Sequence, residues 1–163
     1  MTASKSIFIL LGSNMNNPKL QLKKARKLIV KHLSKIICTS SIYKTAPWGK
    51  DDQPAFYNQV LKLRSGRPAV TVLKIIKEIE QVMGRVFYEQ WGPRIIDIDI
   101  LSYGQEVVRS KPLTIPHAQI SNRLFTLIPL QEVSPRWRHP VSGKSIAYLV
   151  RECKDQLSVI KEK

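Results

Sequence analysis

The stretch from Ile95 to Leu101, IIDIDIL, places two aspartates inside an otherwise aliphatic strand. Alternate residues of a strand project to opposite faces, so the isoleucines are predicted to be buried while Asp97 and Asp99 share the other face. The two carboxylates are about 7 Å apart at the backbone, because a strand rises about 3.3 Å per residue. They repel each other, and burying either charge without a partner is costly. A positive group is therefore expected between them.

Two kinds of partner satisfy this acidic pair. One is a salt bridge from Arg94, and the other is a divalent cation such as Mg²⁺, which binds carboxylate oxygens and keeps positions for water and phosphate. The surrounding sequence favours the cation, because basic side chains that do not need the aspartates as partners are available to hold phosphate oxygens. These side chains are Arg85, Arg94, Lys111, His117 and Arg123. The combination is typical of phosphoryl transfer, and no P-loop or G-x-G-x-x-G sequence indicates another nucleotide site.

A second group of residues suggests a flat, polar ring as the other ligand. The TAPWG stretch at residues 45–49, together with Trp91 and Phe125, offers aromatic faces for stacking. Thr45 and Asn58 offer hydrogen-bond donors and acceptors to a ring edge. The alternative, that phenylalanines such as Phe125 simply fill the core, stays open at this point.

The order of predicted elements is strand, helix, strand, strand, helix, strand, which is typical of a ferredoxin-like βαββαβ sandwich of the α+β class. Strand patterns cover residues 6–11, 35–43, 56–65 and 95–104, and residues 12–14 are predicted to form a turn. Helical patterns lie within residues 17–33, capped by Asn17, and 67–84, from Pro68 to Gly84. The rest is predicted to be a loop-rich C-terminal extension with short helices within 121–130 and 145–153.

Chain length, charge and cysteine content indicate the number of domains, the kind of ligand and the cellular compartment. A chain of 163 residues suits one core, so residues 1–163 are expected to form a single domain. The net charge of +15 attracts polyanions or nucleotide phosphates, although much of it lies within residues 19–35, where a solvated helix face explains it. Cys38 and Cys153 match no disulfide or zinc spacing, and the first apolar run is too short for a membrane span. A cytoplasmic protein with reduced thiols is expected.

Five stretches resemble one known family, in family order from about Leu11 to Pro135. They are LGSN, SSIYKTAPWGKDDQPAFYNQV, EIEQVMGR, WGPRIIDIDIL and LTIPHAQISNRLFTLIPLQEVSP. By these stretches the chain is identified as a member of the 6-hydroxymethyl-7,8-dihydropterin pyrophosphokinase family, and GPRxIDIDIL followed by IPH is highly specific. The resemblance implies a ferredoxin-like fold that transfers pyrophosphate from ATP to the pterin hydroxymethyl oxygen and releases AMP.

The family pattern also implies roles for particular residues. Asp97 and Asp99 are expected to hold two Mg²⁺ ions that bridge the ATP phosphates, and with Arg85 and Arg94 they form the expected catalytic set. Pterin contacts are implied at Thr45, Ala46, Trp48, Phe56, Asn58, Trp91 and Phe125. Nucleotide contacts are implied at Glu80, Arg85, Arg94, Ile100, Lys111, Thr114, His117 and Arg123. We expect a monomer that binds ATP and hydroxymethyl-dihydropterin, and neither nucleic acid nor membrane.

The chain departs from the family pattern at several positions. Phe87 stands where some members carry a second arginine, and the loop VFYEQ is one residue shorter, so one phosphate contact is expected to be lost or replaced. Ala118 and Lys77 replace a tyrosine and a glutamine, which is expected to alter the adenosine contacts. Trp48 replaces a smaller apolar residue in the predicted pterin pocket.

Two long loops, residues 44–56 and 85–94, are expected to act as lids, because closure excludes water and protects ATP from hydrolysis. The competing interpretations are a ferredoxin-like nucleic-acid-binding module and a metal-dependent phosphohydrolase. The first lacks the aromatic RNA-recognition signature, and the second lacks a residue that activates water. The sequence singles out no general base.

Overall fold

A central antiparallel sheet organises the chain, of which the computed structural model describes residues 3–87 and 89–163. Tyr88, in the second predicted loop, lies outside the described residues, as do residues 1–2. The strand order is β5-β1-β4-β3-β8, with β2 also pairing with β4. The bounds are β1 (Lys5–Ser13), β2 (Ile36–Thr39), β3 (Tyr43–Thr45), β4 (Phe56–Ser65), β5 (Asp97–Tyr103) and β8 (Val159–Lys161). A separate hairpin is formed by β6 (Val108–Ser110) and β7 (Leu113–Ile115).

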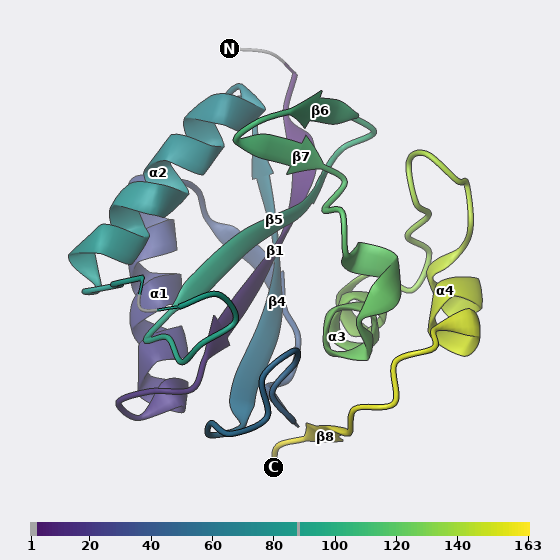
Figure 1. Cartoon of the computed structure of the whole chain (residues 1–163). Coiled ribbons are helices and arrows are strands. Elements are labelled where there is room, and N and C mark those ends of the chain that lie inside the picture. Colours follow the sequence, from purple (N-terminus) through teal and green to yellow (C-terminus); the bar gives the residue numbers. More distant parts are fainter. Residues whose placement is uncertain (1–2, 88) are drawn as a thin grey trace.

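Helices cover the two faces of the sheet unequally (Figure 1). The long helices α1 (Pro18–His32) and α2 (Ala69–Val82) lie on one face and enclose the larger core with aliphatic residues of β1, β4 and β5. The shorter helices α3 (Leu124–Val133) and α4 (Ile146–Glu152), preceded by the 3₁₀ turn η1 (Ile120–Asn122), lie on the other face over a smaller core. The result is an α+β fold with an antiparallel sheet between two helical layers.

The two long helices begin and end where the sequence predicts. The Asn17 side chain accepts a hydrogen bond from Leu20 N at 3.3 Å and so caps α1. Pro68 immediately precedes α2, and Gly84 follows it with φ of 86°, a conformation that favours glycine. No helix in the described ranges is long and apolar enough to cross a membrane.

Three details of the sheet differ from the prediction. The predicted turn at residues 12–14 is wrong, because β1 continues through Gly12 and Ser13 while pairing with β4. The predicted strand over residues 35–43 is broken into β2 and β3, since Ser40 turns its Oγ inward to accept from Val60 N at 2.9 Å. The hairpin and β8 had no counterpart in the prediction, because these strands are only three residues long.

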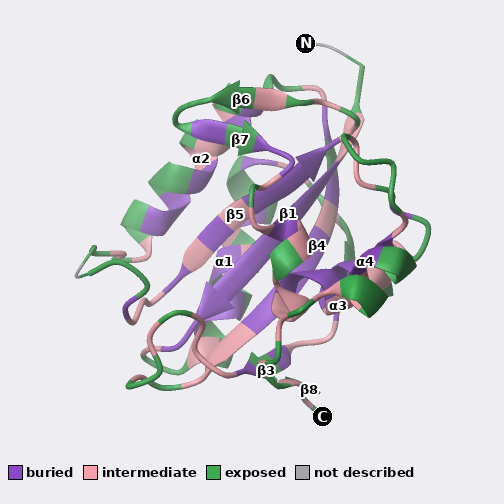
Figure 2. Cartoon of the chain, turned by 45° about the vertical axis from the view of Figure 1, so that its right-hand side comes forward, coloured by how far each residue is buried: buried purple, intermediate pink, exposed green. Residues whose placement is uncertain are grey.

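The short second helical layer leaves part of its sheet face open. Phe8, Leu10, Val60 and Leu101 project from this face into the core beneath α3 and α4. Further along the same face the chain lines a cavity instead. Figure 2 shows the strands mostly buried in the middle of the molecule, with half-buried and exposed loops at their ends.

Candidate active site

The cavity has a volume of about 190 Å³, and its wall has an aromatic part and a charged part. The aromatic part contains every residue predicted to contact a pterin: Thr45, Ala46, Trp48, Phe56, Asn58, Trp91 and Phe125. The charged part contains Arg94, Asp97, Asp99, His117 and Arg123. Predicted residues from three of the five family stretches therefore meet around one space.

The floor of the cavity is one row across three strands. Gly12 of β1 lies opposite Asn58 of β4 on one side and Asp97 of β5 on the other. A Cβ at position 12 would lie 2.8 Å from Asn58 Oδ1, so only glycine leaves this amide undisturbed. Asn58 in turn donates from Nδ2 to Thr45 Oγ1 at 2.7 Å. Because Gly12 has no side chain, the space between the Asn58 amide and the Asp97 carboxylate stays open.

The alternation along β5 is confirmed. Asp97 and Asp99 both line the cavity, whereas Ile96, Ile98 and Ile100 are at most 5% exposed and belong to the core beneath α1 and α2. The strand therefore holds two acids on one face because its other face is fixed by packing.

The expectation that the flanking arginines are free of the aspartates is wrong. Arg85 Nη1 lies 2.8 Å from Asp97 Oδ1, and Arg94 Nη1 lies 3.0 Å from Asp97 Oδ2. Arg85 also donates to Ile96 O at 2.7 Å, which fixes its guanidinium beside β5. A half-buried carboxylate is costly to leave unpaired, so the two arginines converge on it from opposite ends of the second loop. Of the two partners predicted for the acid pair, the salt bridge from Arg94 is present, and Arg85 adds a second salt bridge.

Asp99 lies in a different electrostatic setting from Asp97. No ion pair to it is found among the described residues, and Lys77 and Arg123 act on it only as surrounding charges. Burial, followed by the negative charge of Asp97, raises the pKa of Asp99 to about 7. A cation bound beside Asp99 would favour its ionised form.

Arg123 occupies the boundary between the charged and aromatic parts. Its Cζ lies 4.4 Å from the centre of the Trp48 ring and 5.6 Å from that of Phe125. Its Nε is buried and has no hydrogen-bond partner within the described residues. A buried guanidinium nitrogen without a partner is unusual and is suited to an incoming anionic oxygen.

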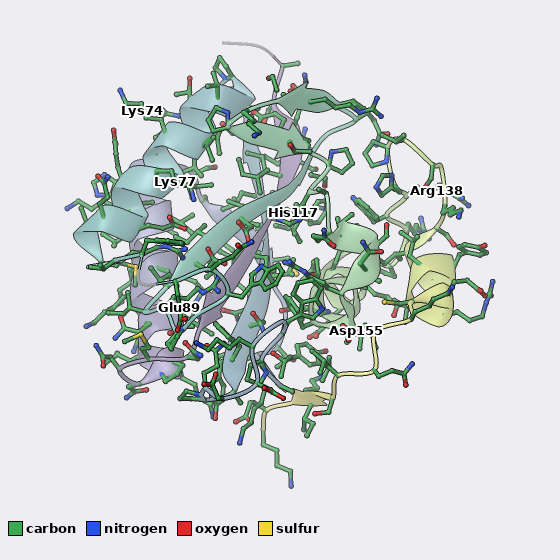
Figure 3. The ribbon with its side chains drawn as sticks, viewed as in Figure 1. Lys74, Lys77, Glu89, His117, Arg138 and Asp155 are labelled. Atoms are coloured by element: carbon green, nitrogen blue, oxygen red, sulfur yellow. The ribbon has the colours of Figure 1, made fainter. Side chains whose placement is uncertain are left out.

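His117 faces the cavity from the segment between β7 and α3, beside β5 (Figure 3). Burial lowers the pKa of His117, and the nearby charge of Arg123 lowers it further. Its Nδ1 accepts from Gln119 N at 3.1 Å, so the neutral ring carries its proton on Nε2. His117 is therefore a neutral hydrogen-bond donor near pH 7.

Several residues predicted to contact the nucleotide lie outside the cavity wall. Glu80 is buried under β5, where it accepts from Ile98 N at 2.8 Å and from Lys77 Nζ at 3.1 Å. Ile100 points into the core. Lys111 and Thr114 are exposed on the β6–β7 hairpin. Their contacts with a nucleotide stay predictions, as does that of Arg85, which reaches the site through Asp97.

Sequence reasoning missed Leu10 and Gly12 as lining residues, and it missed the role of Asn14. Asn14 is 3% exposed and forms side-chain hydrogen bonds to both long loops. Gly12 and Asn14 both belong to the LGSN stretch, so the motif marked their importance without showing their contacts.

The cavity brings an acid pair and cations beside a cluster of aromatic side chains, as expected of a transferase that acts on phosphate-containing groups. The family described as 7,8-dihydro-6-hydroxymethylpterin-pyrophosphokinase (HPPK) matches residues 8–135. This chain belongs to the HPPK family.

Individual proteins agree with the family match. The chain is 40% identical over 150 residues to the 2-amino-4-hydroxy-6-hydroxymethyldihydropteridine pyrophosphokinase of Haemophilus influenzae, covering 91% of this chain and 92% of that protein. It is 36% identical to the protein of the same name from Aquifex aeolicus, covering 86% and 88%. It is 39% identical to the folic acid synthesis protein fol1 of Pneumocystis carinii, of which it covers only 20%.

Solved structures support the fold. The HPPK-DHPS triple mutant of Plasmodium falciparum superposes with a TM-score of 0.77 at 20% sequence identity, covering 93% of this chain. The match covers 44% of the P. falciparum chain, so this chain spans less than half the length of that protein. The comparison therefore places the HPPK-type α+β fold within a longer chain in that organism.

Proposed function

We propose that the cavity described above is where this chain transfers pyrophosphate from ATP to 6-hydroxymethyl-7,8-dihydropterin, the HPPK reaction of folate biosynthesis. One observation carries the assignment: the acids and the aromatic slot share a single floor, with only Gly12 between Asp97 and Asn58. A ring held at the amide end therefore projects a substituent toward the acidic end. The reacting groups meet without any further rearrangement of the sheet.

The pterin ring is proposed to lie in the aromatic part of the cavity. Flat rings gain from stacking against aromatic faces, which Trp48, Phe56 and Phe125 supply. The Asn58 amide, fixed by its hydrogen bond to Thr45, offers a matched donor and acceptor to the ring edge. Trp91, 45% exposed on the second loop, is placed to cover the ring.

The donor set fits Mg²⁺. This ion is commonly held by one or two carboxylates together with substrate phosphates and water, and Asp97 and Asp99 face the cavity together. No cluster of three or more His, Cys, Asp or Glu residues, as an all-protein metal cage needs, occurs in the described part of the chain. We infer that Asp97 and Asp99 hold two Mg²⁺ ions jointly with ATP. When bound, the ions neutralise charge on the phosphates and the transferring group.

The arginine pairs on Asp97 imply an exchange of partners when ATP binds. In the free protein Arg85 and Arg94 neutralise Asp97. Phosphate oxygens offer the same bidentate geometry as a carboxylate, so the two guanidinium groups can turn to ATP while Asp97 turns to the cation. Arg123 Nε, which has no partner among the described residues, is a third donor for phosphate. Each charge keeps a partner throughout the exchange.

The reaction then requires positioning more than covalent chemistry. The pterin hydroxyl oxygen forms a bond to the β-phosphorus, the bond from this phosphorus to the oxygen of the α-phosphate breaks, and AMP leaves with that oxygen. The hydroxyl proton passes to solvent water during the transfer. Arg85 and Arg94 stabilise the charge that develops on the leaving oxygen, an effect that is large in phosphoryl transfer.

The two long loops are proposed to close over both substrates. They already touch, since Trp48 and Trp91 pack edge to face at 5.5 Å and Lys50 Nζ lies 2.7 Å from Glu89 Oε2. Shortening the stretch at residues 86–90 is expected to lower turnover far more than it lowers Mg²⁺ binding. Equal losses of turnover and Mg²⁺ binding would contradict the lid role.

The direct test of the function is incubation with ATP, Mg²⁺ and 6-hydroxymethyl-7,8-dihydropterin, followed by separation of the nucleotides. Pyrophosphate transfer yields AMP and no ADP, whereas an ordinary kinase yields ADP. Omission of the pterin is the control, because AMP formed without it indicates hydrolysis. AMP that depends on the pterin supports the proposal, and its absence overturns it.

We further infer a single ferredoxin-like domain that acts as a cytoplasmic monomer. The strand order β5-β1-β4-β3 with α1 and α2 on one face supports the fold type, and the free cysteines Cys38 and Cys153 are consistent with a reducing compartment. Sedimentation of the full chain at micromolar concentration tests the monomer, and a dimer mass would overturn it.

A further inference from the structure

Asn14 is a buried side chain that neither lines the cavity nor contacts the aspartates of the proposed metal site. It follows β1 directly and is 3% exposed. Its Nδ2 donates to Gln53 Oε1 at 2.9 Å and to Pro54 O at 3.0 Å, both on the first long loop. Its Oδ1 accepts from Arg94 N at 2.9 Å, at the end of the second long loop, and its backbone N donates to Arg94 O at 3.2 Å.

The orientation of this amide is fixed by its partners. Arg94 N can only donate and Pro54 O can only accept, so Oδ1 must face the second loop and Nδ2 the first. The same reasoning orients Gln53, whose Nε2 donates to two carbonyls, Lys50 O at 2.9 Å and Trp91 O at 2.7 Å. Asn14 and Gln53 therefore form a chain of hydrogen bonds that starts at Arg94 N on the second loop, passes through Gln53 on the first loop, and ends at Trp91 O on the second.

Two other contacts between the loops lie at the surface. The Lys50–Glu89 pair has side-chain exposures of 35% and 47%, and exposed ion pairs contribute little. Trp91, which packs on Trp48, is itself 45% exposed. Asn14 is the buried link, and it is attached to the end of the central strand, next to the Gly12 floor.

We propose that Asn14 is a positioning residue that couples the pterin pocket to the phosphate site. The first loop carries Trp48 against the pterin slot, and the second carries Arg94 against Asp97. A ligand that orders either loop fixes the Asn14 amide, so the other loop loses less entropy when its own ligand binds. Each ligand is thus expected to raise the affinity for the other. This inference rests on the proposed placement of pterin and ATP.

The test measures ligand coupling in the full chain by calorimetry. The Kd of 6-hydroxymethyl-7,8-dihydropterin is measured with and without a non-hydrolysable ATP analogue and Mg²⁺, and the ratio of the two values is the coupling factor. Asn14→Asp keeps an oxygen for Arg94 N but loses both donors to the first loop. Gln53→Met removes the acceptor for Asn14 Nδ2 and the donor to Trp91 O, but leaves residue 14 itself unchanged. Lys50→Gln is the control, because it removes the ion pairs of Lys50 with Glu89 and Asp52 and leaves the Lys50 backbone carbonyl in place for Gln53.

In the wild type we expect a coupling factor of about ten or more, within the range common for linked sites. In Asn14→Asp and Gln53→Met the factor falls toward one, while Kd for each ligand alone stays within about threefold. Lys50→Gln keeps the wild-type factor. A factor that is unchanged in folded Asn14→Asp or Gln53→Met overturns the proposal, as does weaker binding of each ligand with the factor intact. Pterin-dependent AMP release by the wild type is scored separately, so failure of the coupling leaves the proposed function standing.

Discussion

Positive charge gathers in two regions of this molecule, the cavity and the exposed face of α1, and the two regions hold that charge differently. At the cavity, Arg85 and Arg94 bind Asp97, and Arg123 stacks on Trp48. On α1 the exposed side chains include the basic residues Lys19, Lys23, Lys24, Lys27 and Lys31. Lys19 pairs with Glu162 at 2.6 Å, while no ion pair is found for the other four within the described residues.

The difference shows that the number of positive charges in a region does not identify the functional site. Lys23, Lys27 and Lys31 are spaced at i, i+4 and repel one another along the helix, which is typical of a solvated face. The cavity has fewer cations than the helix, but each of them is half-buried and held by a carboxylate or an aromatic ring. All of them are directed toward one space. Cations held beside the cavity can stabilise a reaction there, because on ATP binding they exchange one partner for another and do not have to be ordered from solvent.

The largest expected effect is on the acids that organise the cavity. Asp97→Asn and Asp99→Asn each remove a carboxylate from the proposed metal site, so pterin-dependent AMP release should fall by on the order of 10³-fold. Glu152→Gln, at an exposed acid of α4, is the matched control and should retain wild-type activity. Metal-dependent activity retained in both aspartate variants would refute the assignment of the site.

A smaller effect is expected at the aromatic part of the same region. Trp48→Leu removes the ring beneath Arg123 and the edge contact with Trp91, so the affinity for the pterin should fall about tenfold in calorimetry. Tyr148→Leu is the control, because Tyr148 also contacts two cations, Lys144 and Arg151, but lies on the exposed side of α4. An equal loss of pterin affinity in Trp48→Leu and Tyr148→Leu would mean that loss of a cation–ring contact acts through the stability of the fold and not through contact with the pterin.

The third prediction concerns pH. Because the pKa of His117 is lowered on folding, its neutral form contributes stability above the ordinary value of 6.5, and this contribution is lost as pH falls through the folded pKa. An NMR titration of the imidazole, assigned with His117→Gln, should give a pKa below 6.5 in the free protein. A value at or above 6.5 would show that Asp97 outweighs burial and Arg123 at this position.

The smallest effect is expected on the α1 face. Lys27→Gln removes two like-charge pairs, with Lys23 and Lys31, so urea unfolding should show a gain of about 0.5 kcal/mol. AMP release should stay within about twofold of the wild type. Lys154→Gln, outside the helices, is the control and should change neither quantity. A large loss of activity in Lys27→Gln alone would erase the distinction between the two regions.

Sequence patterns were most informative where neighbours in the chain decide the structure. The Asn17 cap, the Gly84 stop and the alternation along β5 depend on local periodicity, and all three are confirmed. The residues predicted to contact the pterin also line one cavity, because the family stretches marked them. The predicted turn at Gly12 was wrong for a physical reason. Glycine is needed there because the Asn58 side chain, on another strand, lies too close to leave room for a Cβ.

The amino-acid sequence by itself determined that two acids share one face of a half-buried strand and that cations and aromatic residues surround them in the chain. Only the tertiary structure decided that both arginines bind Asp97, that Asp99 is left without an ion pair among the described residues, and that Asn14 joins two loops. Asn14 meets Arg94 from 80 residues away. Such partners are chosen by the packing of the sheet and by the need to satisfy buried polar groups, neither of which leaves a local pattern.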